Sequence, residues 1–158
     1  MLHKEGGNPD VVIPAVILHD VGWKSVQEDL QLTAFGPGEK DKKLNRVHER
    51  EGAKIARRVL ETVNYPSPLI GEIEEIVLGH DSRQEALSLN DAIVKDSDKL
   101  WRYSDHAFRV NVKRFGMTGP KYVERLRTKL EEWFLTPTAK GMAREEMRLR
   151  ESSLKLNE

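Results

Sequence analysis

Hydrophobic residues recur along most of this chain at intervals of three and four positions. This spacing is typical of helices that turn one face toward a core, because 3.6 residues complete one helical turn. No stretch alternates apolar and polar residues for long enough to indicate a strand. The pattern predicts an all-α protein, a bundle of five to seven helices, over residues 9–19, 44–63, 68–80, 89–108, 122–134 and about 137–152.

Helix-capping and helix-breaking residues mark where some of these helices begin and end. Asn8-Pro9 is a helix start, because asparagine accepts hydrogen bonds from the first free backbone N–H groups and proline at the first helical position loses none. The helix that follows is apolar nearly all round, which indicates a central place in the fold. Residues 31–43 combine glycine and proline with a run of charges, so we expect a surface loop there.

The length of the chain predicts one domain. A chain of 158 residues buries roughly 70% of its unfolded surface, which is enough for a real core. We therefore expect a single helical domain over residues 1–158, with its core within about 5–135. The charged C-terminal helix over about 137–152 then follows this core.

Composition narrows the kinds of partner and site. Lys and Arg together number 26, as do Asp and Glu, so the net charge of zero gives no argument for a nucleic-acid partner. The chain has no cysteine, so any metal ligands must be His, Asp or Glu. No apolar stretch approaches the roughly 20 residues of a spanning helix, and no succession of charged, apolar and small residues marks a signal peptide. We expect a cytoplasmic protein without a membrane partner; its oligomeric state stays open, a dimer included.

Several histidines and aspartates fall where apolar side chains would be expected. His19 closes the apolar first helix, His48 lies on the inward stripe of its helix, and His80 extends the stripe of the next helix by one turn. One such histidine is more often a hydrogen-bonded core residue than a ligand. Convergence of several favours a shared cation, because buried charges are costly unless paired or bound to a metal. Imidazole and carboxylate suit Mn, Fe, Co, Ni, Zn or Mg.

These residues resemble the HD-domain superfamily of metal-dependent phosphohydrolases over roughly residues 5–110. The motif VIPAVILHDVGW resembles the family's apolar helix that ends in His-Asp-hydrophobe-Gly. Three further segments support the resemblance: RVHEREGAKIARRVL, IEEIVLGHDSR and IVKDSDKLWRY. The resemblance implies an HD-domain-like helical bundle that binds one or two divalent metal ions.

The resemblance also implies a set of ligands. They are the His19-Asp20 dyad, the additional histidines His48 and His80, and the distal aspartate Asp98. Asp96 competes with Asp98 for the distal place. Helical spacing separates those two by about 200°, so both cannot point at one centre, and the register of the family favours Asp98.

The activity that the resemblance implies is hydrolysis of a nucleotide or another small phosphorylated metabolite by metal-activated water. Asp20 and His80 are the implied catalytic residues. The nearest cationic residues in sequence, which are candidates to hold the phosphate or else lie on a solvated helix face, are Arg46, Lys99 and Arg102. The alternatives are a non-catalytic HD-fold module whose structural metal supports binding of a nucleotide or protein partner, and a plain bundle with histidines in its core.

Two features depart from the pattern of the family, and a third concerns the second His-Asp pair of the chain. The family's first histidine lies on a helix about thirty residues before the dyad, but only eighteen residues precede His19 here, so we expect the sequence to begin inside the domain; His3 is the sole substitute. Trp23 stands where many members have lysine, and it is expected to wall the pocket. In the second His-Asp pair, Asp81 precedes polar residues and is expected to cap the helix end or face solvent.

Overall fold

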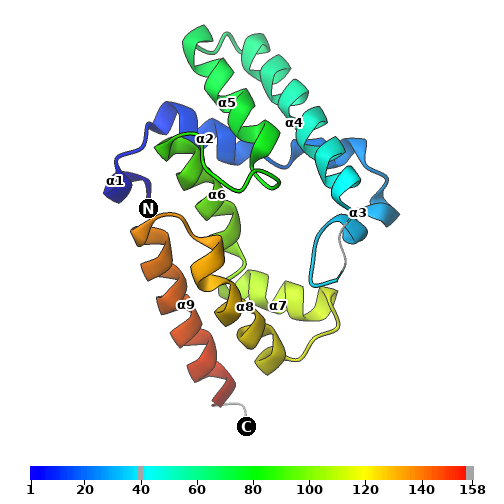
Figure 1. Cartoon of the computed structure of the whole chain (residues 1–158), viewed down its shortest axis with the longest axis vertical. Coiled ribbons are helices and arrows are strands. Elements are labelled where there is room, and N and C mark those ends of the chain that lie inside the picture. Colours follow the sequence, from blue (N-terminus) through cyan, green and yellow to red (C-terminus); the bar gives the residue numbers. More distant parts are fainter. Residues whose placement is uncertain (39–40, 156–158) are drawn as a thin grey trace. The chain divides into compact units, whose positions relative to one another are not determined.

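The computed structural model describes residues 1–38 and 41–155, and all regular elements in that part of the chain are helices (Figure 1). It divides into two compact units. The N-terminal unit comprises Leu2 and Gly6–Val94, and the C-terminal unit comprises Met1, His3–Glu5 and Lys95–Glu158, of which residues 95–155 are described. The all-α prediction is confirmed, whereas the expectation of a single domain stays a prediction.

The N-terminal unit holds most of the predicted site. Its elements in chain order are α2 (Pro9–Leu18), the 3₁₀-helix η1 (Val21–Ser25), α3 (Glu28–Ala34), α4 (Lys42–Thr62), α5 (Ser67–Gly79) and the first residues of α6 (Leu89–Trp101). Helix α4 packs against α5 and η1, and α2 packs against α5. Their shared core contains Val11, Ala15, Ala56, Ile73 and Val77, all 0% exposed or nearly so.

Local sequence explains how the main helices of this unit begin. The side chain of Asn8 accepts a hydrogen bond from the backbone N–H of Asp10 at 2.9 Å, as the Asn8-Pro9 signal predicts. Asp41 caps α4 in the same way, accepting from the N–H groups of Lys43 and Leu44. The predicted loop over 31–43 is therefore shorter, because α3 and α4 extend into it. Glu39 and Lys40 of that loop lie outside the described residues.

The C-terminal unit contains the rest of α6, α7 (Asp105–Arg114), α8 (Gly119–Trp133) and α9 (Pro137–Lys155), together with residues of α1 (Leu2–Glu5). Its core is built around Tyr103, Phe108, Tyr122 and Leu126. Buried Asp96 accepts hydrogen bonds from the N–H groups of Leu135 and Thr136 and from the Thr136 hydroxyl, at 2.7–2.8 Å. This carboxylate therefore fixes the turn between α8 and α9.

The predicted number of helices was too low, because the described residues form nine α-helices. Two are the short α1 and α3, and a third arises because the helix predicted over 89–108 divides into α6 and α7. The division has a local cause: the hydroxyl of Ser104 accepts a hydrogen bond from the N–H of Ala107 and so starts a new helix.

None of the described helices could cross a membrane, because none is both long enough and sufficiently apolar. The most apolar one, α2, has only 10 residues. At 1.5 Å per residue it extends for about half of a bilayer's hydrocarbon core.

Candidate metal centre

The site begins where α2 ends and presents the His19-Asp20 pair. His19 is the C-cap of α2 and Asp20 is the N-cap of η1, so the chain changes direction between them. The Nδ1–H of His19 donates to the carbonyl of Val16 at 2.7 Å. Because Nδ1 makes this bond, Nε2 is the ring nitrogen that faces Asp20, and it lies 3.4 Å from Oδ2 of that carboxylate.

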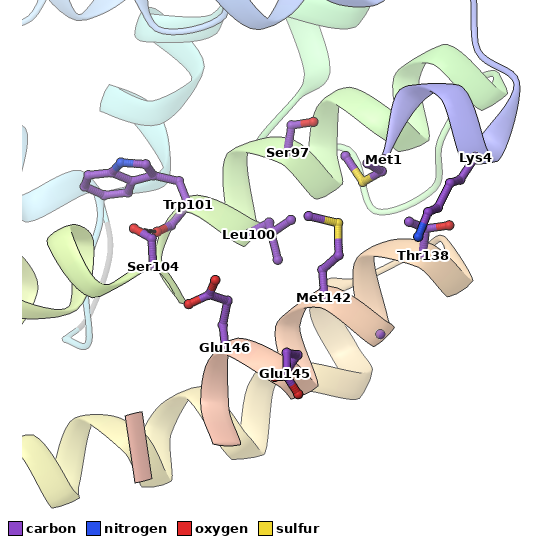
Figure 2. A pocket seen from close by; sticks show the side chains of 11 residues that line it. Met1, Lys4, Ser97, Leu100, Trp101, Ser104, Thr138, Met142, Glu145 and Glu146 are labelled. Carbon is purple, nitrogen blue, oxygen red and sulfur yellow. Dashed lines mark hydrogen bonds between the residues drawn. The ribbon is translucent and has the colours of Figure 1, made fainter. Parts of the chain in front are cut away.

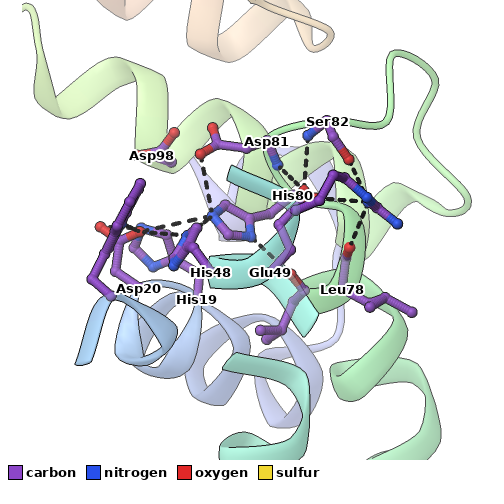
Figure 3. Close-up of polar contacts among 12 residues, drawn as sticks. His19, Asp20, His48, Glu49, Leu78, His80, Asp81, Ser82 and Asp98 are labelled. Atoms are coloured by element: carbon purple, nitrogen blue, oxygen red, sulfur yellow. Dashed lines mark hydrogen bonds and ion pairs between the residues drawn. The ribbon is translucent and has the colours of Figure 1, made fainter. Parts of the chain in front are cut away.

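Helices α4 and α5 bring two buried imidazoles to the same carboxylate (Figure 3). His48 on α4 is 0% exposed, and His80 at the C-cap of α5 is 1% exposed. Their Nε2 atoms are 3.3 Å apart, and Oδ1 of Asp20 lies 3.4 Å from the first and 3.7 Å from the second. The Nδ1–H of His80 donates to the carbonyl of Val77 at 2.8 Å, so Nε2 is the ring nitrogen that faces the group.

These separations fit a shared divalent cation. One ligand atom each from Asp20, His48 and His80 lie within 4.8 Å of one another. An ion that each ligand binds at about 2.1 Å holds its ligand atoms roughly 3.0–3.5 Å apart, close to the separations of 3.3, 3.4 and 3.7 Å. A donor set of two imidazoles and a carboxylate suits first-row transition metals.

Trp23 orients His48 and the carboxylate together. Its indole stacks on the His48 imidazole with ring centroids 4.0 Å apart and planes 11° from parallel. Its Nε1–H donates to Oδ1 of Asp20 at 3.1 Å. Within the described chain, the buried Nδ1 of His48 has no hydrogen-bond partner, so stacking takes the place of the backbone carbonyl that orients His19 and His80. Trp23 thus lines the site, as the sequence predicted, and also contacts two of its ligands.

The charges of the group depend on one another. Burial disfavours the carboxylate of Asp20, but hydrogen bonds from His19 and His80 outweigh burial and hold its pKa well below the ordinary 3.8. Burial also opposes the charging of His80, yet the bond to Asp20 and the charge of Asp81 raise its pKa above the ordinary 6.5. Burial, followed by the charge of His80, lowers the pKa of His48 to about 4.

We expect the imidazole of His48 to remain neutral at pH 6 in metal-free protein and to titrate with a midpoint of about 4. The unfolded state binds this proton from pH 6.5 downward, so His48 reduces the stability of the fold as the pH falls from 6.5 toward 4. The pKa of His80 is raised instead, so the stability that its charged form contributes is lost as the pH rises above 6.5. NMR of isotope-labelled histidine rings would measure the midpoint, with the urea-unfolded protein as reference. A midpoint near 6.5 in the folded protein would contradict the expectation.

Gly22 sets the distance between η1 and α4. A Cβ atom at this position would lie 1.9 Å from the carbonyl oxygen of His48 and 2.6 Å from the backbone nitrogen of Gly52. Glycine is therefore required for the two backbones to come together. This close approach carries Asp20, two residues earlier, up to the imidazole of His48.

Glu49 is a buried residue beside the site that sequence reasoning missed. Its carboxylate is 0% exposed, and its Oε1 accepts hydrogen bonds from the N–H groups of Asp81 at 3.1 Å and Ser82 at 2.8 Å. Burial disfavours its charge, but the bonds from Ser82 and the charge of His80 lower its pKa. A signal was present: Glu49 shares a helical stripe with the buried Ala53, Ala56 and Leu60.

The predicted phosphate ligand Arg46 is held in the same network. Its Nη1 donates to Oε2 of Glu49 at 2.7 Å, to the hydroxyl of Ser82 at 2.6 Å and to the carbonyl of Leu78 at 3.3 Å. These bonds tie α4 to the end of α5. A role for Arg46 in holding substrate stays a prediction.

The other predicted residues belong to the C-terminal unit. The carboxylate of Asp98 pairs with Arg102 at 3.0 Å, and the guanidinium of Arg102 lies 5.8 Å from the centre of the Trp133 ring. Lys99 lies on the same helix, and His3 lies on α1. The N-terminal unit thus unites His19, Asp20, His48 and His80, whereas the parts assigned to Asp98, Lys99, Arg102 and His3 stay predictions.

A groove of the C-terminal unit has different chemistry. It measures about 790 Å³ and is lined by α6 and α9 residues that include Leu100, Trp101 and Met142 (Figure 2). Its two carboxylates, Glu145 and Glu146, form ion pairs with arginines on their own helix. No histidine lines it. The imidazole and carboxylate group of the N-terminal unit therefore remains the candidate centre.

Comparison with known proteins identifies the family of the chain. The model of one protein family, described as the HD domain, matches residues 1–102, which include His19, Asp20, His48 and His80. No curated protein and no solved structure matches the chain. Since the family model covers more than half of the chain, the protein belongs to the HD domain family.

Proposed function

We propose that this protein is a metal-dependent phosphohydrolase that acts on a nucleotide or another small phosphorylated metabolite. The observation that carries the proposal is the convergence of Asp20, His48 and His80, with ligand atoms 3.3–3.7 Å apart. The HD domain family includes metal-dependent phosphohydrolases, which supports the same conclusion. A divalent cation bound by these groups would supply an activated water and neutralise charge on phosphoryl oxygens.

The residues of the chain have separate tasks in this proposal. His48 and His80 would hold the cation through their Nε2 atoms, and Asp20 would supply the negative charge that favours it. His19 stands beside Asp20 as a further ligand. Asp98 is the distal ligand; Asp96 is unsuited to that place because three donors already occupy its carboxylate. Cationic side chains hold the phosphate, with Lys99 and Arg102 as candidates.

The proposal is tested on metal-free protein prepared with a chelator. We expect Mn²⁺, Co²⁺, Ni²⁺ or another divalent ion to raise the melting temperature and to start release of phosphate from a panel of nucleotides and sugar phosphates. Chelator should reverse both effects. Stabilisation without hydrolysis of any ester would favour a structural metal in a non-catalytic module, and no binding of any ion would refute the metal site itself.

A further inference from the structure

We propose that Asp81, the aspartate of the second His-Asp pair, is a further catalytic residue that accepts the proton of the attacking water. The inference rests on the proposed phosphohydrolase function and adds a residue to that site. The sequence predicted that Asp81 caps the helix end or faces solvent; in the structure its carboxylate faces His80 and keeps part of its surface exposed. Its Oδ2 lies 3.7 Å from Nε2 of His80, and the side chain is only 25% exposed (Figure 3).

The backbone of Asp81 is held in place by a buried group. Its N–H and that of Ser82 both donate to Oε1 of Glu49, whose other oxygen accepts from Arg46. A carboxylate buried on α4 therefore fixes the turn that follows His80. The position of the Asp81 side chain beside the imidazole follows from this turn and does not require a bond of its own.

The carboxylate of Asp81 is free of the donors that occupy the structural carboxylates. Glu49 and Asp96 each accept three hydrogen bonds from backbone or side-chain groups. In the described part of the chain, the only cationic partner of the Asp81 carboxylate is His80. Among the described residues no donor other than His80 occupies this partly buried carboxylate, so its lone pairs remain able to accept a proton from water.

The geometry favours proton transfer over metal ligation. Asp81 lies outside the compact group formed by Asp20, His48 and His80. An oxygen atom within about 3 Å of the His80 Nε2 can also lie within hydrogen-bond reach of Oδ2 of Asp81. A water in this place would have a proton acceptor in Asp81, whose side chain is 25% exposed and so is not sealed from solvent.

The water oxygen forms a bond to phosphorus while one of its O–H bonds breaks, and that proton passes to the Asp81 carboxylate. The bond between phosphorus and the leaving oxygen breaks with its electron pair. The leaving oxygen then takes up a proton from Asp81 or from solvent, so that ester and water give an alcohol and phosphate.

The test compares Asp81→Asn with wild-type protein and with Glu85→Gln, a matched removal of an exposed carboxylate four residues further on. Asp81→Asn should lower kcat by about 100-fold or more, the usual contribution of a general base. Its Mn²⁺ affinity, measured by calorimetry, should change by less than about tenfold, the lower limit for residues that orient ligands. Formate should partly restore the kcat of Asp81→Ala, and Glu85→Gln should behave as wild type.

The outcomes separate this inference from the proposed function. A wild-type protein that hydrolyses phosphoesters, together with an unchanged kcat in Asp81→Asn, overturns the role of Asp81 alone. A parallel loss of Mn²⁺ affinity and kcat makes Asp81 a ligand and overturns proton acceptance. Wild-type protein that hydrolyses no ester contradicts both proposals. Circular dichroism and melting temperature confirm that each variant is folded.

Discussion

Asp20→Asn should weaken divalent metal binding by at least about 100-fold, more than the loss usual for residues that only orient ligands. The carboxylate lies 3.4 Å from Nε2 of His48 and 3.7 Å from Nε2 of His80, and it carries the negative charge of the three-residue group. Asparagine has nearly the same shape and can still accept the indole N–H of Trp23 through its oxygen. The substitution therefore removes charge with little change in packing.

Isothermal titration of metal-free protein with Mn²⁺ or Co²⁺ would measure this loss, and elemental analysis of purified protein would show it independently. Asp10→Asn is the matched control, because it removes the same charge from an exposed position at the start of α2, the helix that ends just before the site. Equal affinity in Asp20→Asn and wild type would exclude Asp20 as a ligand. Binding should also weaken as the pH falls, because protons compete with the ion for both imidazoles.

Local signals in the sequence were sufficient to predict much of the N-terminal unit. Asn8 and Pro9 start α2 through bonds that involve only neighbouring residues, so the sequence alone reveals them. The burial of His48 and His80 follows from helical periodicity, which depends on positions three and four residues apart. These predictions were confirmed because they depend on interactions between residues that are close together in the sequence.

Features that depend on packing between helices were harder to predict from the sequence. Glu49 has the polar character of a surface residue, and its burial becomes evident only when the turn after α5 supplies two N–H donors. The orientation of Asp81 depends on the same turn. The stacking of Trp23 on His48 joins residues 25 positions apart through the contact of η1 with α4. Ser104 could cap a helix or continue one, and its capping divided the helix predicted over 89–108.

Gly22→Ala should reduce the free energy of unfolding by about 1–3 kcal/mol, the usual cost of an added carbon in a well-packed contact. The new Cβ would lie 1.9 Å from the carbonyl oxygen of His48 and 2.6 Å from the nitrogen of Gly52. Both are backbone atoms, which no change of rotamer can move. Relief of the clash requires η1 to move away from α4, and this movement separates Asp20 from His48.

Gly71→Ala provides the matched control, because Gly71 lies within α5 and a Cβ there has no atom within 4 Å. Alanine in a helix interior is favoured over glycine, so this variant should gain about 0.5–1 kcal/mol. Urea unfolding of metal-free proteins would measure both changes, and metal titration should show weaker binding in Gly22→Ala alone. If the two variants were equally stable and bound metal equally, the contact between η1 and α4 would not set the geometry of the site. Opposite changes in stability, with metal affinity reduced only in Gly22→Ala, would tie the glycine after the His-Asp pair to the placement of Asp20 against His48.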